Sequence, residues 1–231
     1  MTETWSDTLG ALPLERPHDP GGRVLVLSAH PDDEVLAVGA WLACQTARPI
    51  EFVTATDGEA SHPQSSAVTP DELRDQRPLE LLEALGRLGF ADPVVHRLGL
   101  PDGGLAGTRD ALRAALAPRI GAADLVLAPF EYDGHPDHDA LGDVAGELCA
   151  GGPVLWRFPI WTWVWTEPAD EPWLASARRL VTAPAARDLK RRAIDAFVTQ
   201  IRPVGAAAGD APIVDEALLR HAYGAPEVVI V

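Results

Sequence analysis

Residues 23–34 read RVLVLSAHPDDE, an apolar run that stops at a histidine followed by three carboxylates. The run over residues 23–28 lacks polar alternation, which is typical of a strand buried on both faces of a parallel sheet. In open α/β sheets, functional sites lie just beyond the carboxyl ends of the strands. The polar residues after this strand therefore predict a functional turn.

Strand and helix patterns alternate along the rest of the chain. We expect further strands over residues 50–54, 94–97, 124–128, 154–158 and 227–231, and helices over residues 33–45, 70–88, 108–116, 137–150 and 184–201. This alternation predicts a Rossmann-like three-layer α/β sandwich with a mostly parallel sheet. The length of 231 residues suits one well-buried core. We expect a loose leader over residues 1–22 and a single domain over residues 23–231.

Composition and charge argue against several classes of partner. The formal net charge is −15 and basic residues form only two short runs, so we expect neither nucleic acid nor an anionic membrane as a partner. No apolar segment approaches the roughly 20 residues of a membrane span, and residues 1–10 lack a signal-peptide pattern. Cys44 and Cys149 lie in apolar stretches and are expected to be buried free thiols. These features predict a soluble, cytoplasmic protein.

A second histidine-rich turn, PFEYDGHPDHD at residues 129–139, follows the strand expected at residues 124–128. His135 and His138 repeat the three-residue spacing of His30 and Asp33. A catalytic zinc takes three protein ligands and keeps one position for water, and the two turns together can supply a His-Asp-His set. A remaining carboxylate could deprotonate the water, and a remaining histidine could support the oxyanion or protonate the leaving amine.

A purely structural interpretation is also open for each turn taken alone. Asp32, Asp33 and Asp137 could cap the helices that follow them, and His135 could be an ordinary turn residue. Two such motifs at equivalent strand-to-helix corners favour the metal site.

The two motifs, AHPDDE at residues 29–34 and GHPDH at residues 134–138, resemble the PIG-L/LmbE-like family of zinc-dependent N-acetylglucosaminyl deacetylases. Shorter segments are also similar to that family, and the resemblance covers about residues 23–150. These segments are TDGE at residues 56–59, RPLE at residues 77–80 and PDG at residues 101–103.

The resemblance implies a role for each matching residue. His30, Asp33 and His138 match the family's zinc ligands. Asp32 matches its general base, and His135 matches the histidine that assists the tetrahedral intermediate and the leaving group. Asp102 and Arg77 lie where the family contacts the sugar or orders the site.

Three further residues lie in or beside these motifs. Glu34 is expected to support the metal ligands from behind. Asp133 stands where some members place a tyrosine that helps the intermediate, and Tyr132 is a candidate to replace it.

Residues 150–231 are expected to be a variable region for substrate contact or assembly into a homo-oligomer. Five of the seven tryptophans lie within residues 156–173. Trp161, Trp163 and Trp165 alternate, so their rings would share one face if the segment is extended. Interface or core packing and substrate contact are both open for this cluster.

The sequence therefore predicts a metal-dependent hydrolase that removes an N-acetyl or similar acyl group from a small amino-sugar substrate, acting on a linear amide. Zn²⁺ is the expected cofactor, with Fe²⁺ as an alternative. The rival interpretations are a mononuclear Fe(II) enzyme and a non-catalytic metal- or sugar-binding protein. The second would have little use for Asp32.

Overall fold

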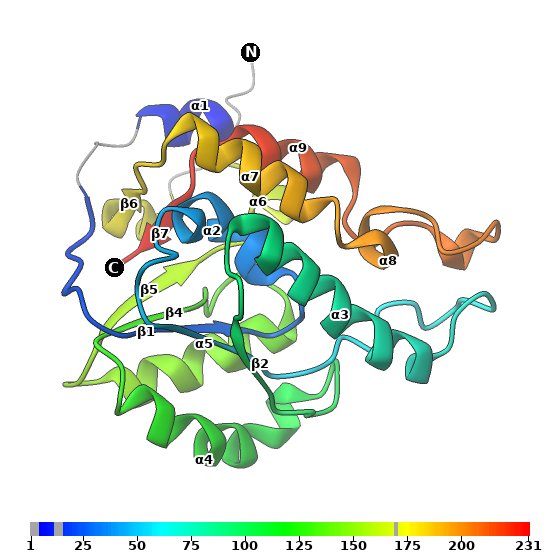
Figure 1. Ribbon diagram of the computed structural model, residues 1–231, viewed down its shortest axis with the longest axis horizontal. Helices are drawn as coiled ribbons and strands as arrows, with labels where there is room; N and C mark the ends of the chain where they lie inside the picture. Colours follow the sequence, from blue (N-terminus) through cyan, green and yellow to red (C-terminus); the bar gives the residue numbers. More distant parts are fainter. Residues whose placement is uncertain (1–4, 12–15, 169–170) are drawn as a thin grey trace.

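A computed structural model describes residues 5–11, 16–168 and 171–231, and it has one seven-stranded sheet in the order β3-β2-β1-β4-β5-β7-β6 (Figure 1). Neighbouring strands among the first five pair in parallel, whereas β7 pairs antiparallel with both β5 and β6. The expected α/β sandwich with a mostly parallel sheet is confirmed. The strand order reverses between β1 and β4, which is where a ligand site is expected.

Six of the seven strands agree closely with the sequence expectations, and β6 was not expected. They are β1 Val24–Ser28, β2 Ile50–Thr54, β3 Val94–Arg97, β4 Leu125–Pro129, β5 Val154–Phe158, β6 Ala177–Arg179 and β7 Val228–Ile230. The α-helices are α1 Trp5–Ala11, α2 Asp33–Ala43, α3 Pro70–Leu88, α4 Arg109–Ile120, α5 Pro136–Cys149, α6 Thr162–Trp165, α7 Pro184–Ile194, α8 Val198–Ile201 and α9 Glu216–Gly224. Three short 3₁₀ turns complete the described elements: η1 Leu105–Thr108, η2 Pro172–Ser176 and η3 Ala208–Asp210.

The sheet separates two apolar layers. Successive side chains of a strand point to opposite faces, so Val24 and Val26 of β1 join the layer beneath α2, α3 and α7, while Leu25 and Leu27 join the layer beneath α4 and α5. Figure 1 places these two groups of helices on opposite sides of the sheet. Both faces of β1 are therefore covered, which explains its unbroken apolar run.

Several sequence expectations were wrong in detail. The helix expected over residues 184–201 is two helices, α7 and α8, separated by residues 195–197. Residues 161–165 are not extended but include the single turn of α6, so Trp161 and Trp165 stack with ring centroids 4.6 Å apart while Trp163 stacks on His221. Cys149 is buried, but Cys44 is exposed.

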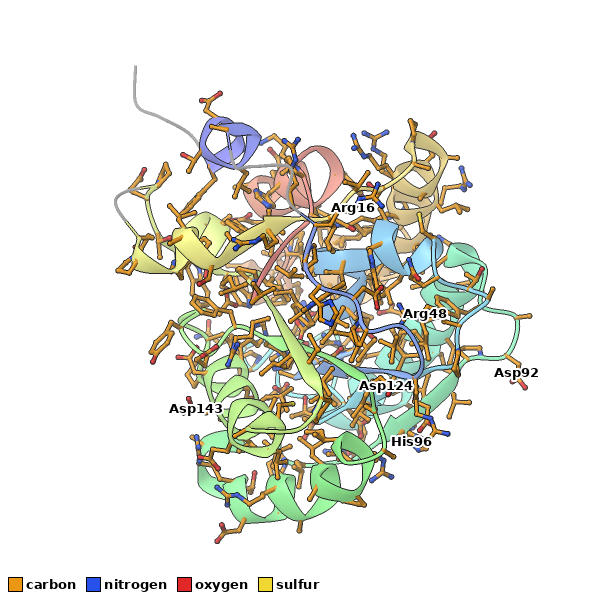
Figure 2. All side chains as sticks on the ribbon, turned by 90° about the vertical axis from the view of Figure 1, so that its left-hand side faces the viewer. Arg16, Arg48, Asp92, His96, Asp124 and Asp143 are labelled. Atoms are coloured by element: carbon orange, nitrogen blue, oxygen red, sulfur yellow. The ribbon has the colours of Figure 1, made fainter. Side chains whose placement is uncertain are left out.

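The segment expected to be a loose leader is partly ordered against the domain. Helix α1 buries Trp5 and Leu9, and the Trp5 ring lies 5.2 Å from Trp163 and 5.6 Å from Trp173. At the amino ends of the strands, Arg48 forms an ion pair of 2.9 Å with Asp19. Asp124 accepts the Arg23 N–H at 2.8 Å, and Figure 2 shows Arg48 and Asp124 on one face of the molecule.

A buried ion pair supports a break in α2, the helix that begins at the site. Val38 leaves helical geometry, and the Glu227 carboxylate accepts the backbone N–H groups of Ala40 and Trp41 at 2.7 and 2.8 Å. Lys190 pairs with Glu227 at 2.8 Å and donates to the Ala37 carbonyl. The backbone groups exposed by the break are thus satisfied.

Over residues 5–11, 16–168 and 171–231, no helix combines the length and the apolar character needed to cross a bilayer.

Replacing His221 by Phe should make the protein less sensitive to acid. Burial, together with the charge of Lys190, lowers the pKa of His221 to about 3. Below pH ~6.5 the unfolded chain binds a proton that the folded chain does not, so stability is lost as pH falls from there toward the folded pKa. Relative to the wild type, His221→Phe should gain about 2 kcal/mol of unfolding free energy between pH 7 and pH 5. Urea denaturation at both pH values measures this difference.

His18→Phe is the control, because His18 is exposed. Parallel pH dependence in the wild type and His221→Phe would contradict the assignment.

Candidate metal and catalytic site

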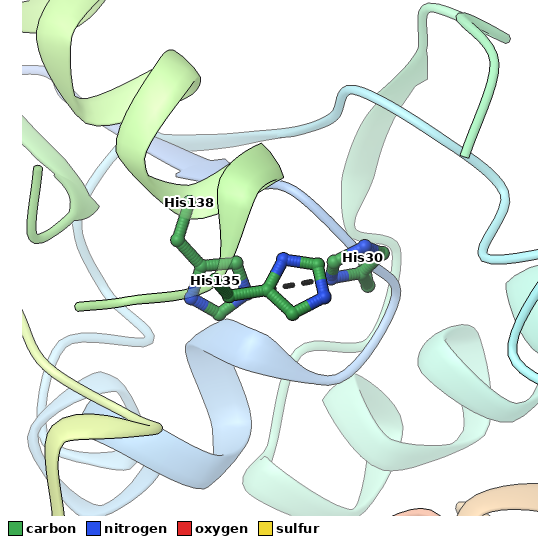
Figure 3. Close-up of side chains that lie close together, drawn as sticks. All are labelled: His30, His135 and His138. Atoms are coloured by element: carbon green, nitrogen blue, oxygen red, sulfur yellow. Dashed lines mark hydrogen bonds between the residues drawn. The ribbon is translucent and has the colours of Figure 1, made fainter. Parts of the chain in front are cut away.

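The two histidine motifs meet at the carboxyl ends of β1 and β4. His30 follows β1, while His135 and His138 lie at the start of α5, and the three rings converge in Figure 3. His30 and His135 line a pocket of about 280 Å³, near the lower end of the roughly 300–1,000 Å³ usual for small-molecule sites. The expected meeting of two distant turns is therefore observed.

Three side chains place metal-binding atoms at suitable separations. His138 Nε2 lies 3.4 Å from His30 Nδ1 and 3.3 Å from Asp33 Oδ1, and His30 Nδ1 lies 3.8 Å from Asp33 Oδ2. Bonds of about 2.0–2.1 Å to a tetrahedral metal put ligand atoms about 3.4 Å apart. Asp33 meets the two histidines through different oxygens, and the composition of the group, two imidazoles and one carboxylate, suits a divalent metal.

Other groups of side chains near His30 also bring ligand atoms together. Nitrogen atoms of His30, His135 and His138 all lie within 4.8 Å of one another, as do ligand atoms of His30, Asp102 and Asp137. The rings of His135 and His138 have centroids 4.8 Å apart. The side chains that could bind a metal are thus clustered around His30.

Carboxylates orient both candidate metal-binding histidines. His138 Nδ1 lies 2.8 Å from Asp133 Oδ2, which turns Nε2 toward His30 and Asp33. His30 Nε2 lies 3.1 Å from Asp102 Oδ1 and 3.5 Å from Asp137 Oδ2. Such contacts fix the tautomer and the ring plane of a metal-binding histidine.

The charges of this cluster balance one another. Burial opposes a charge on His138, but Asp33 and Asp133 outweigh it and raise the pKa of His138 to about 9. Burial also opposes ionisation of Asp33, yet His138 and His30 hold the pKa of Asp33 well below its usual range. Imidazole must be neutral to bind a metal, so metal binding displaces the protons of these histidines.

Asp32 forms its ion pair with Arg77. Its Oδ2 accepts from Arg77 Nη2 at 3.0 Å, and Arg77 Nη1 donates to the Gly58 carbonyl at 2.7 Å. A Cβ at residue 58 would lie 1.7 Å from Arg77 Nη1 and the backbone φ there is +68°, so glycine is required for this approach. Burial raises the pKa of Asp32 despite the nearby guanidinium.

His135 is neutral at neutral pH. Burial and the charges of His138 and His30 lower its pKa to about 4. Its Nδ1 accepts the Asp137 N–H at 3.3 Å as the cap of α5, so the neutral ring carries its proton on Nε2. The capping role that the sequence left open for His135 is therefore real, and it fixes the tautomer.

Asp133 lies in the candidate site with a role that the sequence analysis did not identify. Its carboxylate accepts from the backbone N–H groups of Ile160, Trp161 and Thr162, from the Thr162 hydroxyl, and from His138. Asp133 thus orients His138 and holds the start of α6. The sequence signal for this role was the position of Asp133 five residues before His138. The sequence analysis noted Asp133 only because it differs from the residue that some family members have there.

Other sequence-based roles change with the geometry. Glu34 does not contact His30 but accepts from the Ser28 hydroxyl at 2.7 Å, so its expected support of the ligands was wrong. Tyr132 is 75% exposed, which contradicts a role inside the site. Asp102 and Arg77 line the pocket, and they contact His30 and Asp32 respectively, so their contact with a substrate stays a prediction.

Comparisons with known proteins agree with this geometry. The family model described as GlcNAc-PI de-N-acetylase (PIG-L) matches residues 25–149. A 1D-myo-inositol 2-acetamido-2-deoxy-alpha-D-glucopyranoside deacetylase from Mycolicibacterium smegmatis is 33% identical over 174 residues, which cover 62% of this chain and 59% of that protein. The match thus spans less than two thirds of that relative.

Two solved structures share the fold. An N,N'-diacetylchitobiose deacetylase from Pyrococcus horikoshii superposes with a TM-score of 0.67 at 21% identity, covering 96% of this chain and 88% of that one. The zinc-inhibited form of the teicoplanin deacetylase Orf2 superposes with a TM-score of 0.65 at 19% identity, covering 90% and 97%.

Replacing Asp133 by Asn should weaken metal binding. The amide would place an N–H₂ group among five donors, so His138 would lose its orienting acceptor. We expect the Zn²⁺ affinity of the metal-free protein to fall about 10- to 100-fold, as measured by competition with a chelator of known affinity.

Asp143→Asn is the matched control, because Asp143 is an exposed carboxylate on α5, the helix that carries His138, and it pairs with Arg109 at 3.1 Å. An unchanged affinity in a folded Asp133→Asn protein would contradict the orienting role.

Proposed function

Because the chain belongs to the PIG-L family of GlcNAc-PI de-N-acetylases, we propose that it is a metal-dependent amidohydrolase that removes an N-acetyl or similar acyl group from an amino sugar. The observation that carries the proposal is the division of labour between adjacent carboxylates. Asp33 faces His30 and His138, whereas Asp32 pairs with Arg77 and is left outside that donor set. A site that only bound a metal would not need this second buried carboxylate.

His30, Asp33 and His138 are the metal ligands in this proposal, and Zn²⁺ is the metal. The donor set of two imidazoles and one carboxylate suits zinc with a position left for water. When bound, the metal lowers the pKa of water to about 7 and polarises a carbonyl oxygen.

Asp32 is the general base. It accepts the proton of the attacking water. Arg77 Nη2 donates to Asp32 Oδ2 at 3.0 Å and so fixes the orientation of the carboxylate. Burial raises its pKa, which makes it a better proton acceptor than an exposed aspartate. When the C–N bond breaks, the amine nitrogen takes this proton and the acyl group leaves as a carboxylate.

His135 stabilises the tetrahedral state. Its neutral tautomer donates from Nε2, since Nδ1 is occupied by the Asp137 N–H. A neutral donor at the developing oxyanion needs no change of protonation during the reaction. Trp161 and Trp165 hold the ring in place, each with its centroid 6.3 Å from that of His135.

The substrate is a small amino-sugar conjugate, and Asp102 and Arg77 contribute to its binding. The absence of a spanning helix among the described residues and the acidic net charge of −15 support action in the cytoplasm, away from membranes and nucleic acid. The region over residues 150–231 provides substrate contacts and, in this proposal, surfaces for assembly into a homo-oligomer.

Asp32→Asn should separate the base from the ligands. We expect the variant to bind one equivalent of zinc like the wild type, while acetate release from N-acetylglucosamine or its conjugates falls about 10²- to 10⁴-fold. Metal analysis and an acetate assay on the same samples measure both properties.

Asp33→Asn is the control, because it should lose the metal as well as the activity. Full activity of Asp32→Asn, or failure of the wild type to bind any added zinc, would overturn the proposal.

A further inference from the structure

The pocket beside the candidate metal site has an apolar wall that the proposed chemistry does not use. The larger apolar residues that line it are Leu36, Pro63, Ile160, Trp161, Ile213 and Val214. Leu36 stands one helical turn beyond Asp32 and Asp33 on α2, so the wall begins directly beside the proposed reaction centre. Four of these six residues follow residue 149, where the family match ends.

This wall is held in place by specific contacts. The Gln200 carbonyl accepts the backbone N–H groups of both Ile213 and Val214 at 3.0 Å. Glu80 of α3 accepts from the Thr199 N–H and hydroxyl at 2.9 and 2.7 Å, which fixes α8 next to Gln200. The wall is therefore preformed, which lowers the entropic cost of ligand binding.

A second support comes from the loop after β2. The Ser65 hydroxyl donates to Asp210 at 2.6 Å, and a Cβ at Gly209 would lie 2.6 Å from the Gln64 carbonyl. The two segments, cyan and orange at one end of Figure 1, thus pack too closely for a larger side chain. They carry Pro63 on one side and Ile213 with Val214 on the other.

The charges of the pocket disfavour an anionic group at this wall. Among the described residues that line the pocket, the only Arg or Lys is Arg77, and its two terminal nitrogens already donate to Asp32 and Gly58. The lining carboxylates Asp32, Asp33 and Asp102 are partners of Arg77, His138 and His30, so these cationic groups are not free to bind a further anion.

We propose that this wall is a subsite for an uncharged apolar group carried by the amino sugar. The group is either the N-acyl chain or the aglycone, and the subsite narrows the substrate class of the proposed function, on which it rests. Its affinity comes from removing alkyl or aromatic surface from water.

Two ligand series distinguish the sources. One series lengthens the N-acyl chain of glucosamine from acetyl to octanoyl, and the other lengthens an alkyl aglycone on N-acetylglucosamine from methyl to octyl. Calorimetry gives the dissociation constants with zinc-loaded Asp32→Asn protein, and product assays with the wild type give hydrolysis of the same compounds. In one of the two series, we expect the dissociation constant to fall about threefold to fourfold for each added methylene over the first members.

Variants then test whether this gradient, the gain in affinity with chain length, depends on the apolar wall. Ile213→Asn, made in the Asp32→Asn background, should flatten the gradient, with folding checked by zinc content and thermal unfolding. Val181→Asn is the control, since Val181 is 52% exposed and does not line this pocket, and it should leave the gradient unchanged.

Other outcomes separate the two proposals. A flat response in both series, a gradient that survives Ile213→Asn, or tighter binding of a glycoside ending in a carboxylate would overturn the subsite. A gradient in binding without hydrolysis of any compound would keep the subsite and overturn the proposed function.

Discussion

The parallel pairing of β1 with β4 is the constraint on which the site depends. Val24 pairs with Leu125 and Val26 with Leu127, so both strands leave the sheet at the same edge. The chain after β1 enters α2 on one face, and the chain after β4 enters α5 on the other. The two turns are left facing each other, and His30 meets His138 although 108 residues separate them.

The site then depends on giving adjacent, chemically identical side chains different surroundings. Asp33 points to two imidazoles, which stabilise its charge and lower its pKa. Asp32, one residue earlier, is buried beside one guanidinium, and burial outweighs that attraction and raises its pKa. When the surroundings separate the pKa values of two carboxyl groups in this way, the two groups can take different acid and base roles at neutral pH.

Much of this could be predicted from the sequence, because it depends on local patterns. The unbroken apolar run before His30 predicts a buried parallel strand, and topology then brings the two histidine turns together. The role of Asp133 could not be predicted, since its partners come from α5 and from residues 160–162. The alternation of Trp161, Trp163 and Trp165 is compatible with a strand or a helical turn. Asp133 stabilises the helical turn, because it accepts the backbone N–H groups at the start of that turn. The exposure of Cys44 likewise depends on packing at the end of α2.

The Asp133 carboxylate links the apolar pocket wall to His138. Asp133 orients His138 while holding the backbone of Ile160 and Trp161, whose side chains form part of the apolar pocket wall. Residues that share one hydrogen-bond network do not respond independently to substitution. Substitutions at positions 160 and 161 should therefore leave the His138 ring in place only while the backbone N–H groups of these residues keep reaching Asp133, because moving them would also turn that ring.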